Sequence, residues 1–446
     1  MSGGAPGARG QRQRVAVVGG GWAGLAAAVE ATRTGAHVTL FEMAASPGGR
    51  ARDVVSHGGD LDNGQHICIG AYRETLRLIG AVGVAESAVF ERLPLTLVDA
   101  EGRGLRMGPG PPVPAFARAV AGRRGWSWFE RFALLRVASR WRRAGFRAMP
   151  GETVGDLAAS LPAAVRRDFI EPLCVAALNT PADEASGAVF LRVLRDALVG
   201  DPGSADLLLP RVGLGSVFPG PALAWLERHG GIVRLGHRIG AIERDGGGWR
   251  IDGGRVDRIV IAASAVEAAR LVGPHAAAWA ATACALRYEP IATVYARSAG
   301  SSLPEPMLAL RASDAERPAQ FVFDRGRLGG PAGTLAFVIS GAASWVERGI
   351  AATETATLRQ GHAELGRFLR APLEIVRTIV EKRATFACTP GLVRPSMEVA
   401  PGLLACGDYL AGPYPATLEG AVRSGVAAAR AAAGRSGENS GMKDPA

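Results

Sequence analysis

The stretch RVAVVGGGWAG, residues 14–24, decides the fold of this chain. Its first five residues form an apolar run typical of a buried strand, and a G-x-G-x-x-G turn follows. An Ala-rich segment, residues 25–34, has helical character and ends before Gly35. A second apolar run, residues 38–42, completes the pattern. These segments together predict a strand–helix–strand unit of the kind that binds dinucleotides.

Each glycine of this turn has a separate physical task. Gly19 permits the tight turn, Gly21 lets the backbone approach a pyrophosphate, and Gly24 lets the helix pack closely on the strand. Ala23 belongs to the same helix start, whose N–H groups and partial positive charge attract phosphates. Glu42, at the end of the second strand, is placed to accept both ribose hydroxyls, which favours an adenosine without a 2′-phosphate. The alternative is a glycine-rich turn without a ligand.

Further elements of the same kind lie beyond this unit. Gly48-Gly49-Arg50 follows closely, and here the glycines let the backbone run against a ligand while Arg50 neutralises a phosphate. The segment LDNGQH, residues 61–66, comes next. This order resembles the opening of FAD-dependent amine oxidases, carotenoid desaturases and protoporphyrinogen oxidases. Nicotinamide dehydrogenases usually lack the Gly-Gly-Arg element, so the resemblance favours FAD over NAD.

The resemblance assigns cofactor contacts along the rest of the chain. It implies that Gly64 lies where the chain passes the flavin and that the backbone at Ile239 contacts the adenine. Near the C-terminus, Gly407-Asp408 follows an apolar run, and the family places this carboxylate near the ribityl or pyrophosphate oxygens. Thr417-Leu418 then opens a helix whose N-terminus points at the flavin, where negative charge accumulates on reduction.

A set of longer blocks resembles one particular family, the hydroxysqualene dehydroxylases, also called squalene-associated FAD-dependent desaturases. This family implies reductive removal of an allylic hydroxyl from hydroxysqualene, a lipophilic isoprenoid, with reduced FAD as hydride donor. No site for an electron donor is visible in the sequence. The blocks are GGGWAGL (19–25), LDNGQH (61–66), AYRETLRLIG (71–80), PLCVAALNTP (172–181) and GDYLAGPYPATLEGAVRSG (407–425).

The resemblance does not identify the acid that protonates the leaving hydroxyl. Four residues are candidates because they lie near the flavin motifs: His66, Asp62, Tyr409 and Tyr414. A lone histidine is more often a hydrogen-bonded structural residue. We expect no metal site and find no nucleophile–base pair.

The length of the chain and the alternation of its strand-rich and helix-rich segments predict its domain organisation. With 446 residues it exceeds one compact core. We expect an α/β protein in which a discontinuous, Rossmann-like FAD-binding domain is joined to a mixed α+β substrate domain, as in amine oxidases and phytoene desaturases. The expected FAD-binding segments are 14–90, 205–270 and 381–433, the substrate-domain segments are 91–204 and 271–380, and 434–446 is a flexible tail.

Composition limits the partners and the compartment. The formal charge is +10, yet no nucleic-acid-binding motif occurs, so we expect no nucleic-acid partner. Five widely spaced cysteines suit a reducing compartment. The apolar run 15–29 ends too early at Glu30 to span a bilayer. We therefore expect a cytoplasmic protein that touches the inner face of the membrane peripherally.

The segment 118–147 is the basis for that expectation. It carries nine arginines and a single acidic residue, Glu130, interleaved with Trp126, Trp128, Phe129, Phe132 and Trp141. Arginine with tryptophan and phenylalanine at helical spacing suits the interface of an anionic bilayer. The alternative is an amphipathic helix whose aromatic face packs on its own domain.

Two interpretations stay open elsewhere. The apolar stretch 171–181 is either a lipid pocket with one orienting polar group or a core helix that ends at Asn179. The rival functions are a carotenoid or phytoene desaturase-type FAD dehydrogenase, which has the opposite electron flow, and a non-catalytic prenyl-lipid carrier. An amine oxidase is a weaker alternative, because 171–181 offers few aromatic residues for a flavin-facing cage.

Overall fold

A computed structural model describes residues 12–54, 61–313 and 315–434. Its largest sheet has six strands in the order β10-β2-β1-β14-β21-β20, parallel except for the last. These strands come from three distant parts of the chain, which is the discontinuity that the sequence predicts. Their bounds are β1 (Arg14–Val18), β2 (His37–Phe41), β10 (Ile232–Arg234), β14 (Arg258–Ile261), β20 (Glu398–Ala400) and β21 (Leu403–Ala405).

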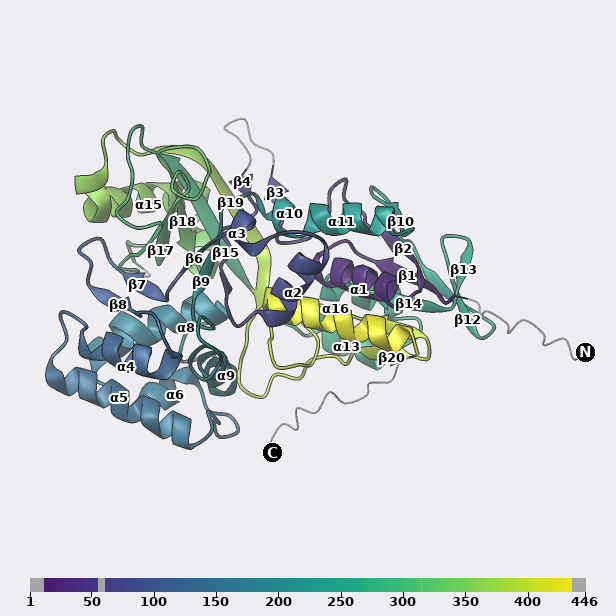
Figure 1. The fold of residues 1–446 in the computed structure, drawn as a ribbon, viewed down its shortest axis with the longest axis horizontal. Coiled ribbons are helices and arrows are strands. Elements are labelled where there is room, and N and C mark those ends of the chain that lie inside the picture. The colour runs from purple at the N-terminus through teal and green to yellow at the C-terminus, as the bar shows by residue number, and fades with distance from the viewer. Residues whose placement is uncertain (1–11, 55–60, 314, 435–446) are drawn as a thin grey trace, which may run out of the picture.

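Alternation along β1 explains why this sheet has a covered layer on each side. Val15 and Val17 pack into one hydrophobic cluster, while Ala16 and Val18 pack into another. The first cluster holds α1 and α16, which lie side by side over the sheet (Figure 1). The helices around the sheet are α1 (Trp22–Arg33), α2 (Arg73–Ala81), α10 (Leu214–Val217), α11 (Pro219–Arg228), α12 (Ala265–Val272), α13 (Ala277–Cys284) and α16 (Leu418–Ala432).

The second large sheet has five antiparallel strands in the order β16-β17-β18-β15-β19. One face of β15 carries Ala292 and Val294 and packs on the helices of this half. The other face carries Ile291, Thr293 and Tyr295. The elements are β15 (Tyr288–Arg297), β16 (Met307–Ala309), β17 (Phe321–Asp324), β18 (Thr334–Ile339), β19 (Glu374–Phe386), α14 (Ala343–Arg348), α15 (Ile350–Leu365) and a 3-10 turn, Gly366–Phe368.

Short strands form three further small sheets, β3-β4, β5-β9-β6 and β7-β8, and a small antiparallel meander contacts the six-stranded sheet. The strands of these small sheets are β3 (Asp53–Val54), β4 (Leu61–Asp62), β5 (Cys68–Ile69), β6 (Phe90–Leu93), β7 (Thr96–Val98), β8 (Gly104–Arg106) and β9 (Leu207–Pro210), and the helix α3 (Glu86–Val89) precedes β6. The meander is β11 (Ile242–Asp245), β12 (Gly248–Ile251) and β13 (Gly254–Val256).

A helical layer lies below the five-stranded sheet, at the lower left of Figure 1, with α5 at its outer edge. It consists of α4 (Pro112–Ala121), α5 (Trp128–Arg143), α6 (Val154–Ala158), α7 (Ala163–Val165), a π-helical turn at Arg166–Ile170, α8 (Glu171–Leu178) and α9 (Gly187–Leu198). None of the helices in the described ranges is both long and apolar enough to cross a bilayer.

The structure confirms the α/β fold class and the strand–helix–strand unit at the N-terminus. The boundaries that we assigned to the alternating segments remain predictions. Apart from Gly434, the tail 434–446 lies outside the described residues.

Candidate functional site

The first glycine turn joins β1 to α1. Gly19 has φ +114° and its N–H donates to the Phe41 carbonyl at 2.7 Å, which ties the turn to β2. A Cβ on Gly24 would lie 1.9 Å from the Gly19 oxygen and 2.9 Å from Ala262 Cβ. The close approach of helix and strand that the sequence predicts is therefore present, and it tolerates no side chain at residue 24.

The second glycine turn stands directly against the first. Gly48 and Gly49 both have positive φ, and the Gly48 N–H donates to the Gly20 carbonyl at 2.8 Å. A Cβ on Gly49 would lie 3.2 Å from Gly21 Cα. Two bare backbone segments thus border the N-terminus of α1, where Ala23 is also buried. This surface fits a pyrophosphate, because backbone N–H groups and the helix dipole favour anions there.

Glu42 lies at the end of β2, beside this turn, and is 8% exposed. Its carboxylate accepts from Gly20 N–H at 2.5 Å and from Ala44 N–H at 2.7 Å. The carboxylate is therefore fixed at the position predicted for ribose recognition, and the ribose contact itself remains a prediction. Ile239 is buried, and its carbonyl accepts from Arg270 Nη2 at 2.8 Å. This carbonyl keeps a second lone pair, and the contact with adenine remains a prediction.

Arg50 connects three distant segments. Its guanidinium donates to the Asp408 carboxylate and, at 2.7 Å, to the Ala384 carbonyl of β19. The two charged residues predicted at the cofactor therefore meet each other, so a phosphate beside Arg50 would also face Asp408. Gly407 is needed for a reason that the sequence does not reveal, because a Cβ there would lie 2.4 Å from the Tyr409 ring.

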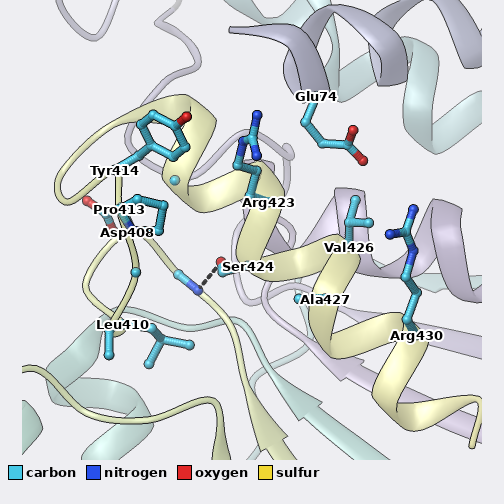
Figure 2. Close-up of a pocket in the computed structure, with 14 residues that line it drawn as sticks. Glu74, Asp408, Leu410, Pro413, Tyr414, Arg423, Ser424, Val426, Ala427 and Arg430 are labelled. Carbon is cyan, nitrogen blue, oxygen red and sulfur yellow. Dashed lines mark hydrogen bonds between the residues drawn. The ribbon is translucent and has the colours of Figure 1, made fainter. Parts of the chain in front are cut away.

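The start of α16 is capped by Thr417, whose Oγ1 accepts from Gly420 N–H at 2.9 Å. Leu418 follows as the first residue of the helix. The loop from Asp408 to Tyr414 folds back beside α16, and a pocket lies between them (Figure 2). Charged residues from two helices, Glu74, Arg423 and Arg430, also line this pocket.

Tyr414 is held in place at this pocket by two arginines. Its hydroxyl accepts from Arg192 Nη2 at 3.0 Å, and the guanidinium carbons of Arg192 and Arg423 lie 4.9 and 4.8 Å from the ring centroid. Burial raises the pKa of Tyr414, which makes it a poor proton donor near neutral pH.

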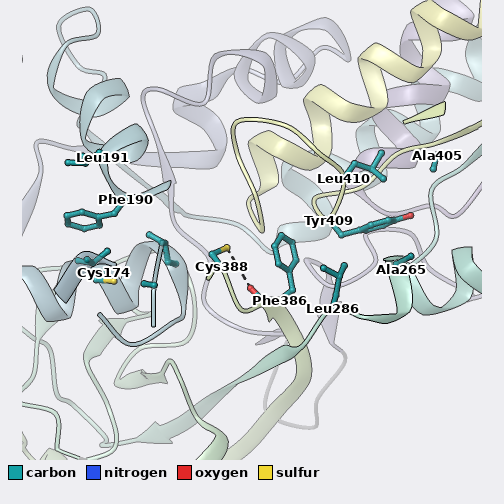
Figure 3. Packing of buried hydrophobic residues seen from close by; sticks show 14 of the residues in the cluster. Cys174, Phe190, Leu191, Ala265, Leu286, Phe386, Cys388, Ala405, Tyr409 and Leu410 are labelled. Carbon is teal, nitrogen blue, oxygen red and sulfur yellow. Dashed lines mark hydrogen bonds between the residues drawn. The ribbon is translucent and has the colours of Figure 1, made fainter. Parts of the chain in front are cut away.

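Tyr409 is 2% exposed and lies in a hydrophobic cluster with Leu286, Phe386 and Leu410 (Figure 3). Its ring meets Trp279 edge-on at 6.4 Å, and its hydroxyl has no hydrogen-bond partner among the described residues. Burial raises its pKa well above the usual value, so this tyrosine also releases a proton poorly.

His66 lies partly buried on the loop after β4. Its Nδ1 is 2.9 Å from the Gly64 carbonyl, which only accepts, so Nδ1 carries the proton and donates. Burial lowers the pKa of His66, and nearby Arg50 lowers it further. The imidazole is therefore neutral at pH 7 and presents an accepting Nε2, which suits a base better than an acid.

Asp62 is 1% exposed at the end of β4. Its Oδ1 accepts from Leu214 N–H at 2.8 Å, and its Oδ2 lies 3.5 Å from Arg325 Nη2. Burial raises the pKa of Asp62 to about 6, against the opposing effect of Arg325, and the neighbouring Asp53 also raises it. Among the four candidates for the acid, Asp62 is therefore the one with a pKa close to neutral pH.

Sequence reasoning did not single out Glu419, which is fully buried on α16. Its carboxylate accepts from Glu74 N–H at 3.1 Å, Thr75 N–H at 2.9 Å, Thr75 Oγ1 at 2.7 Å and Arg423 Nε at 2.6 Å. It therefore caps the N-terminus of α2 from 345 residues away. The blocks 71–80 and 407–425 contact each other through this carboxylate, although nothing in either block alone indicates the pairing.

The apolar stretch 171–181 forms α8 and the turn after it, which begins at Asn179. Asn179 ends α8 in the left-handed region, with φ +50°. Its amide nitrogen donates to Glu289 O at 3.2 Å and Thr385 Oγ1 at 2.9 Å, and its Oδ1 accepts from Gly341 N–H at 2.6 Å. These bonds fasten α8 to the five-stranded sheet. Asn179 therefore has a structural role at the end of α8, and the choice between a core helix and a lipid pocket for the rest of the segment stays a prediction.

The segment 118–147 carries both buried and exposed aromatic side chains. Trp126 and Trp141 are buried, so the expectation that Trp126 contacts a membrane was wrong: it precedes the cap Ser127 and packs inward. Three aromatic side chains at the start of α5 are exposed instead, namely Trp128 (76%), Phe129 (73%) and Phe132 (66%).

The two glycine turns, the N-terminus of α1 and the Arg50–Asp408 pair lie next to one another and form one cradle. The residues present therefore fit the pyrophosphate of FAD. Comparison with known proteins agrees with it. The chain matches the family described as flavin containing amine oxidoreductase over residues 22–433, and it belongs to this family. It is an FAD-dependent oxidoreductase.

Two relatives of the chain have a more specific name than the family does. The chain is 26% identical over 460 residues to a hydroxysqualene dehydroxylase of Sinorhizobium fredii, covering 94% of this chain and 97% of the relative. It is 27% identical over 442 residues to that of Rhodopseudomonas palustris, covering 93% and 97%. The structure of cyclohexylamine oxidase from Brevibacterium oxydans aligns with a TM-score of 0.68 at 19% identity, covering 95% of this chain and 99% of that one, and shows the same fold.

Proposed function

We propose that the protein reductively dehydroxylates hydroxysqualene to squalene. In this reaction the alcohol and reduced FAD yield the hydrocarbon, water and oxidised FAD, and a separate electron donor then reduces the flavin again. The observation that carries the proposal is the apolar face of the five-stranded sheet, opposite the LDNGQH segment. Buried Leu61, Leu207, Leu209 and Phe323 meet half-buried Ile291 and Ile379 there. The similarity to two hydroxysqualene dehydroxylases over nearly the whole chain supports it.

Reduced FAD supplies a hydride to the carbon that loses the hydroxyl. The chain binds the dinucleotide through Gly21, Gly49 and the N-terminus of α1, and Arg50 orients its phosphate end. The apolar cluster around Leu61 excludes water, which would otherwise capture an allylic cation. The chain therefore binds and orients the cofactor and keeps water away from the reacting carbon.

The departing hydroxyl also needs a proton, and we assign it to Asp62. Neutral His66 and the high-pKa phenols of Tyr409 and Tyr414 are poor acids at neutral pH. With its pKa raised to about 6, the Asp62 carboxyl keeps a protonated fraction near neutrality. Its Oδ2 is buried without a hydrogen-bond partner among the described residues and so has a position to offer a proton.

The test is to offer hydroxysqualene, without oxygen, to enzyme whose flavin has been reduced chemically. We expect squalene in the lipid extract and return of the yellow oxidised flavin. Asp62→Asn should retain the flavin but slow squalene formation by roughly 10²- to 10⁴-fold, as expected for loss of a general acid. If wild-type enzyme forms no squalene and its flavin stays reduced, the proposal fails.

We also propose that the protein reaches its substrate by peripheral contact with the inner face of the membrane, through the start of α5. Exposed Trp128, Phe129 and Phe132 provide an apolar surface, and exposed Arg124, Arg136 and Arg140 provide positive charge for anionic headgroups. The capping box between Ser127 and Glu130 holds the first turn of the helix in place.

Flotation with vesicles of anionic and of neutral lipid tests this contact. Replacing Trp128, Phe129 and Phe132 together by Ser should reduce binding to anionic vesicles by about tenfold or more, with flavin content unchanged. The matched control replaces Val266, Ile350 and Val393, which are also exposed, by Ser and should bind like wild type. Equal binding by the two triple variants would retire the membrane proposal.

A further inference from the structure

Three buried side-chain atoms near the LDNGQH segment have no hydrogen-bond partner among the described residues. They are Asp62 Oδ2, Gln65 Nε2 and Thr293 Oγ1. Buried polar atoms in folded proteins are paired in the great majority of cases, because an unpaired one loses its hydration without compensation. A group of them therefore points to a polar ligand atom that they are built to meet.

Thr293 stands out against its surroundings. It is 1% exposed on β15, between Ile291 and Tyr295, on the face that meets the apolar cluster around Leu61. A Cβ placed on Gly64 would lie only 3.6 Å from Thr293 Oγ1, so this hydroxyl lies directly against the backbone of the LDNGQH segment. A threonine hydroxyl can both donate and accept, which matches the needs of an alcohol oxygen.

The orientation of Gln65 is fixed by its neighbours. Arg325 Nη1 donates to Gln65 Oε1 at 3.2 Å, while Arg325 Nη2 lies 3.5 Å from Asp62 Oδ2. Because the oxygen of the amide is already used by a cation, the amide nitrogen of Gln65 is left as a donor. Arg325 is itself 4% exposed, so this chain of contacts lies inside the protein. It leaves the neutral amide NH₂ group of Gln65, with its two N–H donors, unpaired.

We propose that Gln65 Nε2 and Thr293 Oγ1 bind the hydroxyl oxygen of the isoprenoid alcohol, at the polar end of an otherwise apolar site. This inference rests on the proposed function, and it names the residues that distinguish an alcohol from the corresponding hydrocarbon. Arg325 is a positioning residue that orients the Gln65 amide. A site built to hydrogen-bond a hydroxyl rejects the analogue that lacks it, because its own donors are then left unpaired.

The experiment measures binding rather than turnover. Oxidised enzyme, which cannot deliver a hydride, is titrated with hydroxysqualene and with squalene in the same detergent micelles, and the flavin absorbance reports each dissociation constant. Wild type should prefer the alcohol, and Thr293→Val and Gln65→Met should each reduce that preference by about five- to tenfold. Thr293→Ser keeps the hydroxyl and should keep the preference. Arg325→Met should lower it while leaving squalene binding unchanged, which a general loss of structure would not do.

The outcomes separate the two claims. A wild-type preference for the alcohol that survives in both Thr293→Val and Gln65→Met overturns this inference and leaves the proposed function standing. Equal affinity of wild type for both lipids also overturns it, while the isoprenoid class stands. If wild type binds neither lipid, the proposed function falls and this inference falls with it. Flavin content and melting temperature confirm that each variant is folded.

Discussion

The six-stranded and the five-stranded sheets are bordered by different kinds of contact. Around the first, the structure brings backbone against backbone: Gly24 against Gly19, and Gly49 against Gly21. Around the second, it gathers side chains, and Thr293 meets a segment more than two hundred residues earlier in the chain. The glycine turns are therefore formed by residues close in sequence, whereas the contacts beside the five-stranded sheet join residues that are distant in sequence.

Two buried carboxylates, one beside each sheet, also differ in the number of hydrogen bonds that they accept. Glu419 beside the six-stranded sheet accepts four hydrogen bonds. Asp62, at the junction with the five-stranded sheet, leaves Oδ2 without a hydrogen bond among the described residues and has a raised pKa. A satisfied carboxylate contributes stability, and an unsatisfied one is costly unless a ligand completes it. This contrast can be tested one residue at a time.

The largest effect is expected at Gly24. Gly24→Ala puts a Cβ 1.9 Å from the Gly19 carbonyl, where backbone must move, so we expect loss of bound FAD and destabilisation by roughly 3 kcal/mol or more. Gly80→Ala in α2 is the matched control, because nothing lies within 4 Å of its Cβ. It should stabilise the protein by up to about 1 kcal/mol in urea unfolding. Normal FAD content in Gly24→Ala would break the account of the turn.

A smaller effect is expected at Glu419. Glu419→Gln keeps the shape of the side chain but replaces an accepting oxygen by a donor facing N–H groups of α2. We expect a loss of about 2–4 kcal/mol in the free energy of unfolding. Glu398→Gln, at an exposed position, should change it by less than about 0.5 kcal/mol. Equal losses in both variants would contradict the capping role.

The smallest effect is the pH dependence at Asp62, which faces Arg325, Asp53 and Tyr295. Its pKa is about 6 in the folded protein against an ordinary 3.8, so between these values the native state binds more protons than the unfolded state. Its contribution to stability therefore falls as pH rises from about 4 to 6 and is constant above that. Asp62→Asn removes this titration.

Unfolding of the two proteins at a series of pH values measures that effect. The stability difference between wild type and Asp62→Asn should move in favour of the variant, by on the order of 2 kcal/mol, as pH rises through this window. Parallel curves would show that Asp62 has an ordinary pKa. Asp62 would then lose its claim to be the proton donor.

Features formed by residues close in sequence could be predicted from the sequence, and features formed by distant residues could not. The strand–helix–strand unit was predictable because its glycine turn, strands and helix are close in sequence, and the FAD class was predictable from the family resemblance of the Gly-Gly-Arg element; both are confirmed. Helical periodicity indicated an amphipathic α5 but could not show that Trp126 precedes the cap and packs inward. Glu419, Arg325 and Thr293 were missed because each acts on a partner more than two hundred residues away.

The direction of electron flow tests the central claim most directly. Two anaerobic mixtures are compared, reduced enzyme with hydroxysqualene and oxidised enzyme with squalene, and flavin absorbance and lipid products are followed in both. The account predicts that only the first mixture changes, forming one squalene for each flavin that regains its yellow colour. Bleaching of the oxidised flavin by the hydrocarbon, with a dehydrogenated lipid as product, would contradict it and identify a desaturase instead.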